Sequence, residues 1–143
     1  MPSSIHRITS VPGFRKPIAP ISYAVASGHT VYVSGCLGVD GNGKLVSGGA
    51  QAQAKKALEN MKVVLESAGS SMDKVIKTIV LLSDMKDFQT VNEEYAKWFT
   101  TENYPARSCF TVKQLPLGGL VEIEAVAIRS NSKDSNQELT AKL

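Results

Sequence analysis

The segment YPARSCFTVKQLPLGGLVEIEAVAIR, residues 104–129, decides the fold of this 143-residue chain. It contains two runs of strand type, which are joined by a loop rich in proline and glycine. The first run opens with Arg107 among small and apolar residues, and the second places Glu122 and Glu124 in apolar surroundings. Charges inside apolar strands are costly to bury unless they are paired or used. We therefore look for the chemistry of the protein in this segment.

The last run of this segment has two different faces. Alternate residues of a strand share a face, so one face is entirely apolar and consists of Val121, Ile123, Ala125 and Ala127. The other face begins with Glu122 and Glu124 and becomes apolar at Val126 and Ile128. A domain this small has too few helices to cover both faces of a sheet. The surplus apolar face predicts a homo-oligomer whose sheets pack together, with Glu124 at or near a subunit interface.

The remaining periodicities place these strands in a single α+β domain, residues 1–130. Apolar residues spaced as on one helix face predict an amphipathic helix from residue 49 to Gly69, and Asp87 is a suitable N-cap for a second helix. The run VIKTIVLL, residues 75–82, is typical of a strand covered on both faces. The element order β-β-β-α-β-α-β-β predicts a mixed β-sheet with two helices on one face. We expect the polar residues 131–143 to form a flexible tail.

Composition and charge exclude several classes of protein. The chain is 43% hydrophobic and 20% charged, as in globular domains, and its net charge of +3 is scattered, so nucleic acid is an unexpected partner. No run has membrane-spanning length, no signal peptide is recognisable, and no metal-binding motif is present. Two cysteines without a CxxC pair fit a reducing compartment, which predicts the cytoplasm. The ending Ala141-Lys142-Leu143 resembles a peroxisomal targeting tripeptide and indicates the peroxisome as the alternative.

The charges of the opening segment admit two interpretations. The planar fork of arginine grips carboxylates with two hydrogen bonds, so Arg107 is a candidate binder of a small anion. If the two strands are neighbours, Arg107 instead forms a buried structural pair with Glu122 or Glu124. Spacing alone leaves both interpretations open. For Glu122 we favour a position at the strand end that points to solvent, but not for Glu124, which lies one pleat deeper.

Three further residues have both a functional and a structural interpretation. Cys109 shares a strand face with Arg107, and a nearby cation lowers the pKa of a thiol, but no histidine is placed to act as its base. Asn92 falls on the apolar stripe of the second helix, where it is either a satisfied buried amide or a ligand donor. Gly35 and Gly38 mark either a bend that ends a strand or a close approach of the backbone to a ligand.

Motifs spread over residues 5–129 together resemble the Rid family, the RidA/YjgF reactive intermediate deaminases. These motifs are Tyr32-Val33-Ser34-Gly35, Ala57-Leu58-Glu59-Asn60-Met61, Val75-Ile76-Lys77-Thr78, Asp87-Phe88, Val91-Asn92-Glu93, Pro105-Ala106-Arg107-Ser108-Cys109, Leu115-Pro116 and Val121-Glu122-Ile123-Glu124-Ala125. The resemblance implies a chorismate-mutase-like (YjgF-type) domain and a homotrimer with a central barrel of sheets and active sites at subunit clefts. It also implies hydrolysis of 2-iminopropanoate, 2-iminobutanoate and related enamines to 2-oxo acids and ammonia, a form of metabolite damage control. Such enzymes need no cofactor and no metal.

The resemblance assigns roles to individual residues. Arg107 would bind the substrate carboxylate, and Glu124 would order the attacking water and shuttle protons. Cys109 would contribute its main chain rather than its sulfur. The residues expected to bind substrate are Gly35, Ser34, Asn92 and Tyr23.

The sequence departs from the family pattern at two positions. Ile21 stands where family members often carry a tyrosine, and Tyr23, on the same strand face, is the candidate replacement. Cys36 replaces the usual glutamine. These changes leave the preferred imine open. The alternatives to a deaminase are an endoribonuclease or translation inhibitor that acts on RNA, and a non-catalytic ligand-binding or chaperone-like trimer.

Overall fold

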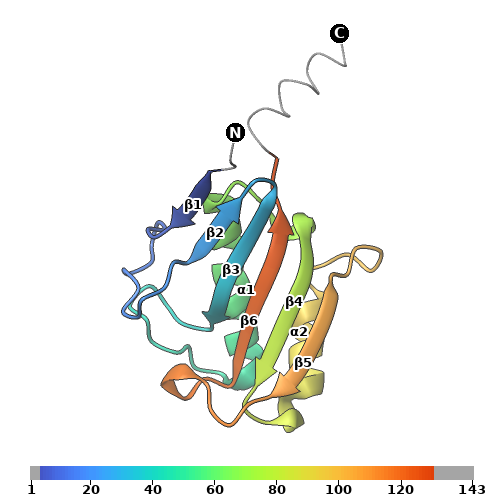
Figure 1. Ribbon diagram of the computed structural model, residues 1–143. Coiled ribbons are helices and arrows are strands. Elements are labelled where there is room, and N and C mark those ends of the chain that lie inside the picture. The colour runs from blue at the N-terminus through green and yellow to red at the C-terminus, as the bar shows by residue number, and fades with distance from the viewer. Residues whose placement is uncertain (1–3, 131–143) are drawn as a thin grey trace.

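The computed structural model describes residues 4–130, which form one six-stranded sheet and two α-helices (Figure 1). The elements are β1 (Ile5–Ile8), β2 (Ala24–Ser27), β3 (Thr30–Leu37), α1 (Gly49–Ser67), β4 (Val75–Leu82), α2 (Phe88–Ala96), β5 (Ala106–Thr111) and β6 (Val121–Ile128). Three short 3-10 turns are η1 (Met72–Lys74), η2 (Met85–Asp87) and η3 (Pro116–Gly118). The α+β class and the predicted element order are confirmed. The predicted tail and the terminal tripeptide lie outside the described residues.

The strand order is β1-β2-β3-β6-β4-β5. β4 and β5 are parallel, as expected of strands joined through a helix, and every other neighbouring pair is antiparallel. The last strand therefore returns to the middle of the sheet, between β3 and β4. The premise that the two strands of residues 104–129 are neighbours is wrong, because β4 separates β5 from β6.

One face of the sheet is covered by α1 and α2, and the core lies between these layers (Figure 1). The apolar face of β6 that the sequence predicted is buried here, as is the predicted stripe of α1. Removal of each fully buried Leu, Ile or Val side chain from water stabilises the fold by roughly 1.5–3 kcal/mol. The helix α1 ends at Ser67, and Gly69 follows it with a φ of 81°, as expected of a glycine after a helix.

The start of α2 differs from the prediction. Asp87 occupies the N-cap position but has helical dihedral angles and makes no capping hydrogen bond through its side chain. Asp84 takes this role one turn earlier, because its carboxylate accepts a hydrogen bond of 2.9 Å from the backbone N–H of Lys86. The cap therefore begins the turn η2, which continues directly into α2.

The opposite face of the sheet is open. β4 is covered on one face within this chain, not on both as its sequence predicted. Large apolar side chains, each about half exposed, stand on this face and are Tyr32, Ile76, Phe110 and Ile128. Within residues 4–130 there is neither a helix long and apolar enough to cross a membrane nor a cluster of side chains suited to a metal ion.

Candidate active site in two halves

The first half of the candidate site is built around Arg107 on the edge strand β5. Its Nη1 donates a hydrogen bond of 2.7 Å to Oδ1 of Asn92 on α2. Its guanidinium carbon lies 4.9 Å from the ring centre of Tyr95 and 5.9 Å from that of Phe88. The hydroxyl of Tyr95 is itself bonded to the buried Thr78 at 2.7 Å, which fixes the ring. Packing and hydrogen bonding thus hold the guanidinium in one position.

This guanidinium retains donors for a ligand. Its contacts within residues 4–130 are an amide and two aromatic rings, whereas the described salt bridges join other residues. Arginine has five N–H donors in a fixed fork, and one of them is used by Asn92. The small cavity beside it, about 270 Å³ in volume, is lined by Asn92, Tyr95, Ala96, Tyr104, Pro105 and Arg107. The arrangement suits a small carboxylate.

Cys109 lies on the same face of β5 as Arg107 and is partly buried. Burial raises the pKa of its thiol, and the lowering effect of the Arg107 charge is the smaller of the two. The thiol form is therefore favoured at neutral pH, which argues against a nucleophilic sulfur. β5 is the last strand of the sheet, so one of its edges has no neighbouring strand within the described chain. Backbone groups on that edge are available to a ligand or to another copy.

The second half of the candidate site is formed where β3 meets β6. The pairing of these strands shifts between Val33 and Cys36, so Gly35 sits at a bulge. A Cβ added to Gly35 would lie 2.6 Å from Oε1 of Glu122, which shows that this carboxylate rests directly over the glycine backbone. Of the two interpretations of Gly35, the bend that ends a strand is wrong, because β3 continues to Leu37. Bulges of this kind redirect side chains near functional sites.

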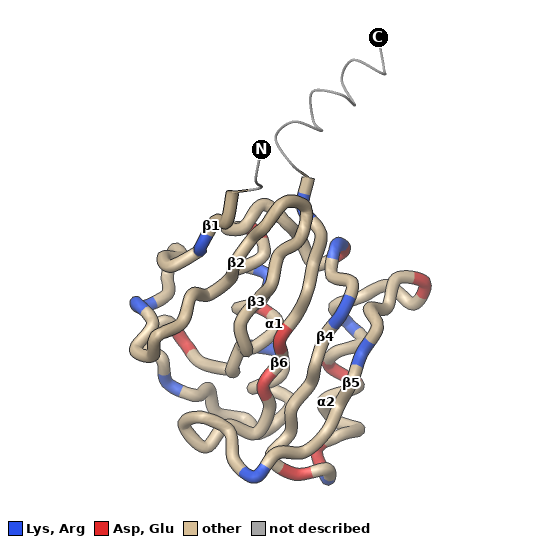
Figure 2. The backbone as a smooth tube through the Cα atoms, viewed as in Figure 1, with Lys and Arg blue, Asp and Glu red and all other residues tan. Residues whose placement is uncertain are grey.

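The two glutamates of β6 differ in their surroundings. Both lie on the open face in the middle of the sheet, where Figure 2 shows the acidic positions of β6. Glu122 is half-buried, and burial, followed by the charge of Glu124, raises the pKa of its carboxyl group. Our expectation that Glu122 points to solvent is therefore wrong. Glu124 lies one pleat further along, opposite Ile79 of β4.

Ser34 and Tyr23 hold the loop between β1 and β2 against β3. Ser34 Oγ donates a hydrogen bond of 2.6 Å to the carbonyl of Ser22. The hydroxyl of Tyr23 donates to the carbonyl of Arg15, and its ring packs edge-on against Phe14 with the ring centres 5.3 Å apart. Burial raises the pKa of Tyr23, and the Arg15 charge offsets this in part. The predicted role of Tyr23 as a substitute hydroxyl remains a prediction.

The two halves do not meet within one chain. Arg107 is in register with Thr78, and Thr78 with Ala125, so Arg107 faces the helix layer. Glu122 and Glu124 project from the other face. A structural ion pair between Arg107 and either glutamate of the same chain is therefore excluded. Of the predicted site residues, the structure groups Arg107 with Asn92 and Cys109, and Ser34 and Gly35 with Tyr23. Glu122, which was not among them, joins the second group, whereas Glu124 does not line the cavity that this group shares.

The close approach at Gly35 yields a first prediction. Gly35→Ala is compatible with the backbone, because Gly35 is not among the glycines with positive φ, but its methyl group displaces the Glu122 carboxylate. Misplacing a reacting group by about 1 Å costs on the order of a hundredfold, so a role of Glu122 in the chemistry predicts that kcat falls by roughly 10². Thermal unfolding should change little. In a Glu122→Gln background the same substitution should add almost nothing, and a fully additive loss would contradict this coupling.

The comparisons with known proteins agree on one family. The sequence profile described as endoribonuclease L-PSP matches residues 14–129. Over 129 residues the chain is 50% identical to the RutC family protein UK114 of Drosophila melanogaster, covering 90% of this chain and 93% of that protein. It is 47% identical over 130 residues to human 2-iminobutanoate/2-iminopropanoate deaminase, covering 90% and 94%. The crystal structure of E. coli TdcF with bound serine superposes with a TM-score of 0.79 at 36% identity, covering 87% of this chain and 100% of TdcF.

Proposed function

Because the chain belongs to the endoribonuclease L-PSP family, which is the Rid/YjgF family, we propose that it hydrolyses 2-imino acids such as 2-iminopropanoate and 2-iminobutanoate to 2-oxo acids and ammonia. The observation that carries the proposal is the Arg107 guanidinium, held by Asn92 and two rings beside an open cavity. A fixed guanidinium that has no carboxylate partner among residues 4–130 suits the carboxylate that every 2-imino acid carries. Two relatives support this chemistry, since one is named a deaminase of such imines and another was solved with the amino acid serine.

The reaction requires a proton relay and a positioned water rather than a covalent nucleophile. We assign the relay to Glu122, because its carboxyl group lies over Gly35 at the candidate site and its raised pKa extends the pH range in which it can donate a proton. The acid protonates the imine nitrogen, and the resulting carboxylate takes a proton from water as the water oxygen bonds to C2. A second proton transfer to nitrogen breaks the C–N bond, and the hydroxyl proton returns to the carboxylate. One water is consumed, and one 2-oxo acid and one ammonia are formed.

Glu124, which the family resemblance assigns to the water, is the second candidate for this relay. Its position beside Glu122 supports a different contribution, because its negative charge raises the pKa of Glu122. On this basis Glu124 extends to higher pH the range in which Glu122 is protonated. The two assignments make different predictions for the corresponding glutamine variants.

A complete site on this proposal needs two copies of the chain. Arg107 lies on the helix side of an edge strand, and Glu122 lies on the open face, so a second copy packed against the open face brings the two halves together. The half-exposed apolar side chains of that face give the association a driving force. The homotrimer implied by the family resemblance is one closed ring that repeats such a contact.

The open face provides a second prediction. Tyr32→Asp places a charge at the centre of this face, where the wild-type side chain is 55% exposed in the single chain. We expect the variant to dissociate to monomers in sedimentation experiments and to lose turnover, because no site is complete in a monomer. Met85→Asp, a substitution of a similarly exposed apolar residue in η2, should leave the assembly intact. A monomeric Tyr32→Asp variant with full activity would contradict a shared site.

The activity itself is tested by a coupled assay. A pyridoxal-phosphate dehydratase acting on serine or threonine supplies the imine, and release of 2-oxo acid and ammonia is followed with and without the protein. We expect acceleration over spontaneous hydrolysis, and no acceleration with any imine would overturn the proposal. RNA cleavage is the second candidate function, because the family is described as endoribonuclease L-PSP. The two histidines of the chain, His6 and His29, line neither half of the site. RNA cleavage that persists in the Arg107→Ala variant would separate such an activity from this site.

A further inference from the structure

The half-site at Glu122 opens into a cavity much larger than a three-carbon imino acid requires. The cavity has a volume of about 620 Å³, and its wall includes Ser34, Gly35 and Glu122. Pockets of roughly 300–1,000 Å³ are the size that holds drug-sized ligands. Away from Glu122 the wall is mostly apolar and includes Phe14, Ile18, Ile21, Leu37, Val63 and Leu117. The polar end is therefore continuous with a wide apolar chamber.

Leu117 stands at this chamber in an unusual conformation. It has a φ of 61° and is the one non-glycine residue with positive φ within the described part of the chain. Its side chain is 57% exposed, although it is apolar. The turn η3 holds it there, because Gly118 N–H bonds to the carbonyl of the buried Leu115 at 3.2 Å. A side chain kept in a strained and exposed position is a marker of function.

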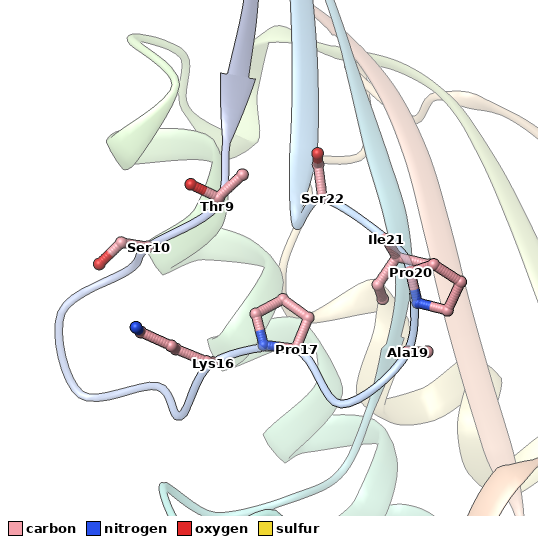
Figure 3. Close-up of a pocket in the computed structure, with 8 residues that line it drawn as sticks. All are labelled: Thr9, Ser10, Lys16, Pro17, Ala19, Pro20, Ile21 and Ser22. Carbon is pink, nitrogen blue, oxygen red and sulfur yellow. The ribbon is translucent and has the colours of Figure 1, made fainter.

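The loop between β1 and β2 supplies another part of the apolar wall. Figure 3 shows this loop leaving β1, passing through Lys16 and Pro17, and returning through Ile21 to β2. Ile18 and Ile21 are exposed apolar residues of this loop, and both line the chamber. The Tyr23 hydroxyl and the Arg15 carbonyl fasten the loop in place. This part of the wall therefore belongs to a loop whose position is fixed by a hydrogen bond.

Most of the charged residues at the chamber are engaged by other groups of the chain, whereas Lys16 adds one further charge to its wall. Lys56 pairs with Glu59 at 3.5 Å. The Arg15 guanidinium lies against the backbone of Gly43, where a Cβ would come within 2.0 Å of its central carbon. Asp40 accepts hydrogen bonds from the backbone of its own turn. Apart from Lys16, the surface that is left for a ligand beyond Glu122 is mainly apolar.

We propose that this chamber binds the side chain of the substrate and selects 2-imino acids with large apolar side chains, such as those derived from leucine and phenylalanine, over 2-iminopropanoate. The inference rests on the proposed deaminase function and specifies its substrate class. The reacting carbon lies at Glu122, and the side chain extends from it between the β1–β2 loop and Leu117. Burial of several carbon atoms of the substrate against this wall favours the larger imines.

The test compares imines generated by an L-amino-acid oxidase from alanine, leucine and phenylalanine. We expect kcat/KM for the leucine-derived imine to exceed that for 2-iminopropanoate by roughly tenfold. In Leu117→Lys a charge replaces part of the apolar wall, so this ratio of kcat/KM values should fall at least fivefold. A fivefold change is roughly the lower end of what one hydrophobic contact contributes to discrimination between substrates. Leu117→Gly, which relieves the backbone strain, should lower the ratio as well. Ile5→Lys changes an exposed apolar residue of β1 outside the chamber and should leave the ratio unchanged.

Binding of the products separates this inference from the proposed function. Calorimetric titration with 4-methyl-2-oxopentanoate and with pyruvate does not require turnover, and we expect the larger acid to bind more tightly in wild type and to lose that advantage in Leu117→Lys. If imines are hydrolysed but 2-iminopropanoate is equal or preferred, the chamber is not the side-chain site while the deaminase function stands. If no imine is hydrolysed, the function fails. In that case the titrations still test the chamber. If the Leu117→Lys variant prefers 4-methyl-2-oxopentanoate over pyruvate as strongly as the wild type does, the chamber assignment is overturned as well.

Discussion

Replacement of Arg107 with alanine is expected to lower kcat/KM for 2-imino acids by roughly a hundredfold to a thousandfold, the usual cost of deleting one partner of a hydrogen-bonded charge pair. The guanidinium is the group that we assign to the substrate carboxylate, and its fork is fixed by Asn92 and by two rings. Steady-state kinetics with a coupled 2-oxo acid assay measures the loss. Arg107→Lys should recover only part of it, because an ammonium keeps the charge but not the bidentate geometry.

A matched variant controls for the loss of a positive charge. Arg7→Ala removes an arginine from the exposed edge strand β1, far along the sheet from β5, and should leave turnover unchanged. Sedimentation and thermal unfolding should show that Arg107→Ala remains folded and assembled. An assembled Arg107→Ala protein with wild-type kcat/KM would remove Arg107 from the site.

Replacement of Glu122 with glutamine is expected to lower kcat by about 10²–10⁴, the usual contribution of a general acid–base. The amide keeps the shape of the side chain over Gly35 but can neither donate a carboxyl proton nor accept one. Glu124→Gln should have a smaller effect at neutral pH. Because the Glu124 charge raises the pKa of Glu122, its removal should move the alkaline decline of activity to lower pH. A large loss in Glu124→Gln together with a small one in Glu122→Gln would instead assign the relay to Glu124.

The raised pKa of Glu122 also predicts how the stability of the fold depends on pH. The folded chain keeps this proton in a pH range in which the unfolded chain has released it, so stability falls as pH rises from the ordinary glutamate value of 4.5 through the raised pKa. Glu122→Gln removes this dependence. Thermal unfolding at about pH 4 and pH 8 should show the variant gaining on the wild type at the higher pH. An equal difference at both values would contradict a raised pKa in the folded protein.

The sequence was sufficient for the elements and for half of the site. Apolar spacing located α1, and the isolated charge at Arg107 marked β5, because local periodicity and the cost of a buried charge are both readable along the chain. Strand neighbours are set by contacts between distant segments, so nothing in residues 104–129 indicated that β4 lies between β5 and β6. The condition that the two strands are neighbours could therefore not be decided from the sequence.

Glu122 was misplaced for a related reason. Its place near the end of the strand favoured solvent exposure. In the structure, however, the bulge at Gly35 of β3 leaves space for a carboxylate over the glycine backbone, and Glu122 occupies that space. The strain at Leu117 was equally invisible, because a Pro-Leu-Gly-Gly loop is compatible with several turns. The one signal for this half of the site is Gly35. A glycine within a strand pattern often marks a bulge or a close approach of another group to the backbone.

The most direct test of the shared site is to mix two inactive variants. Arg107→Ala and Glu122→Gln subunits are unfolded together, refolded at equal concentrations and assayed for imine hydrolysis. If Arg107 of one copy acts with Glu122 of its neighbour, a random mixture should regain about one quarter of wild-type activity, because about one neighbouring pair in four combines both intact residues. Activity no higher than that of the separate variants, in a mixture shown to contain hetero-oligomers, would contradict a site shared between copies.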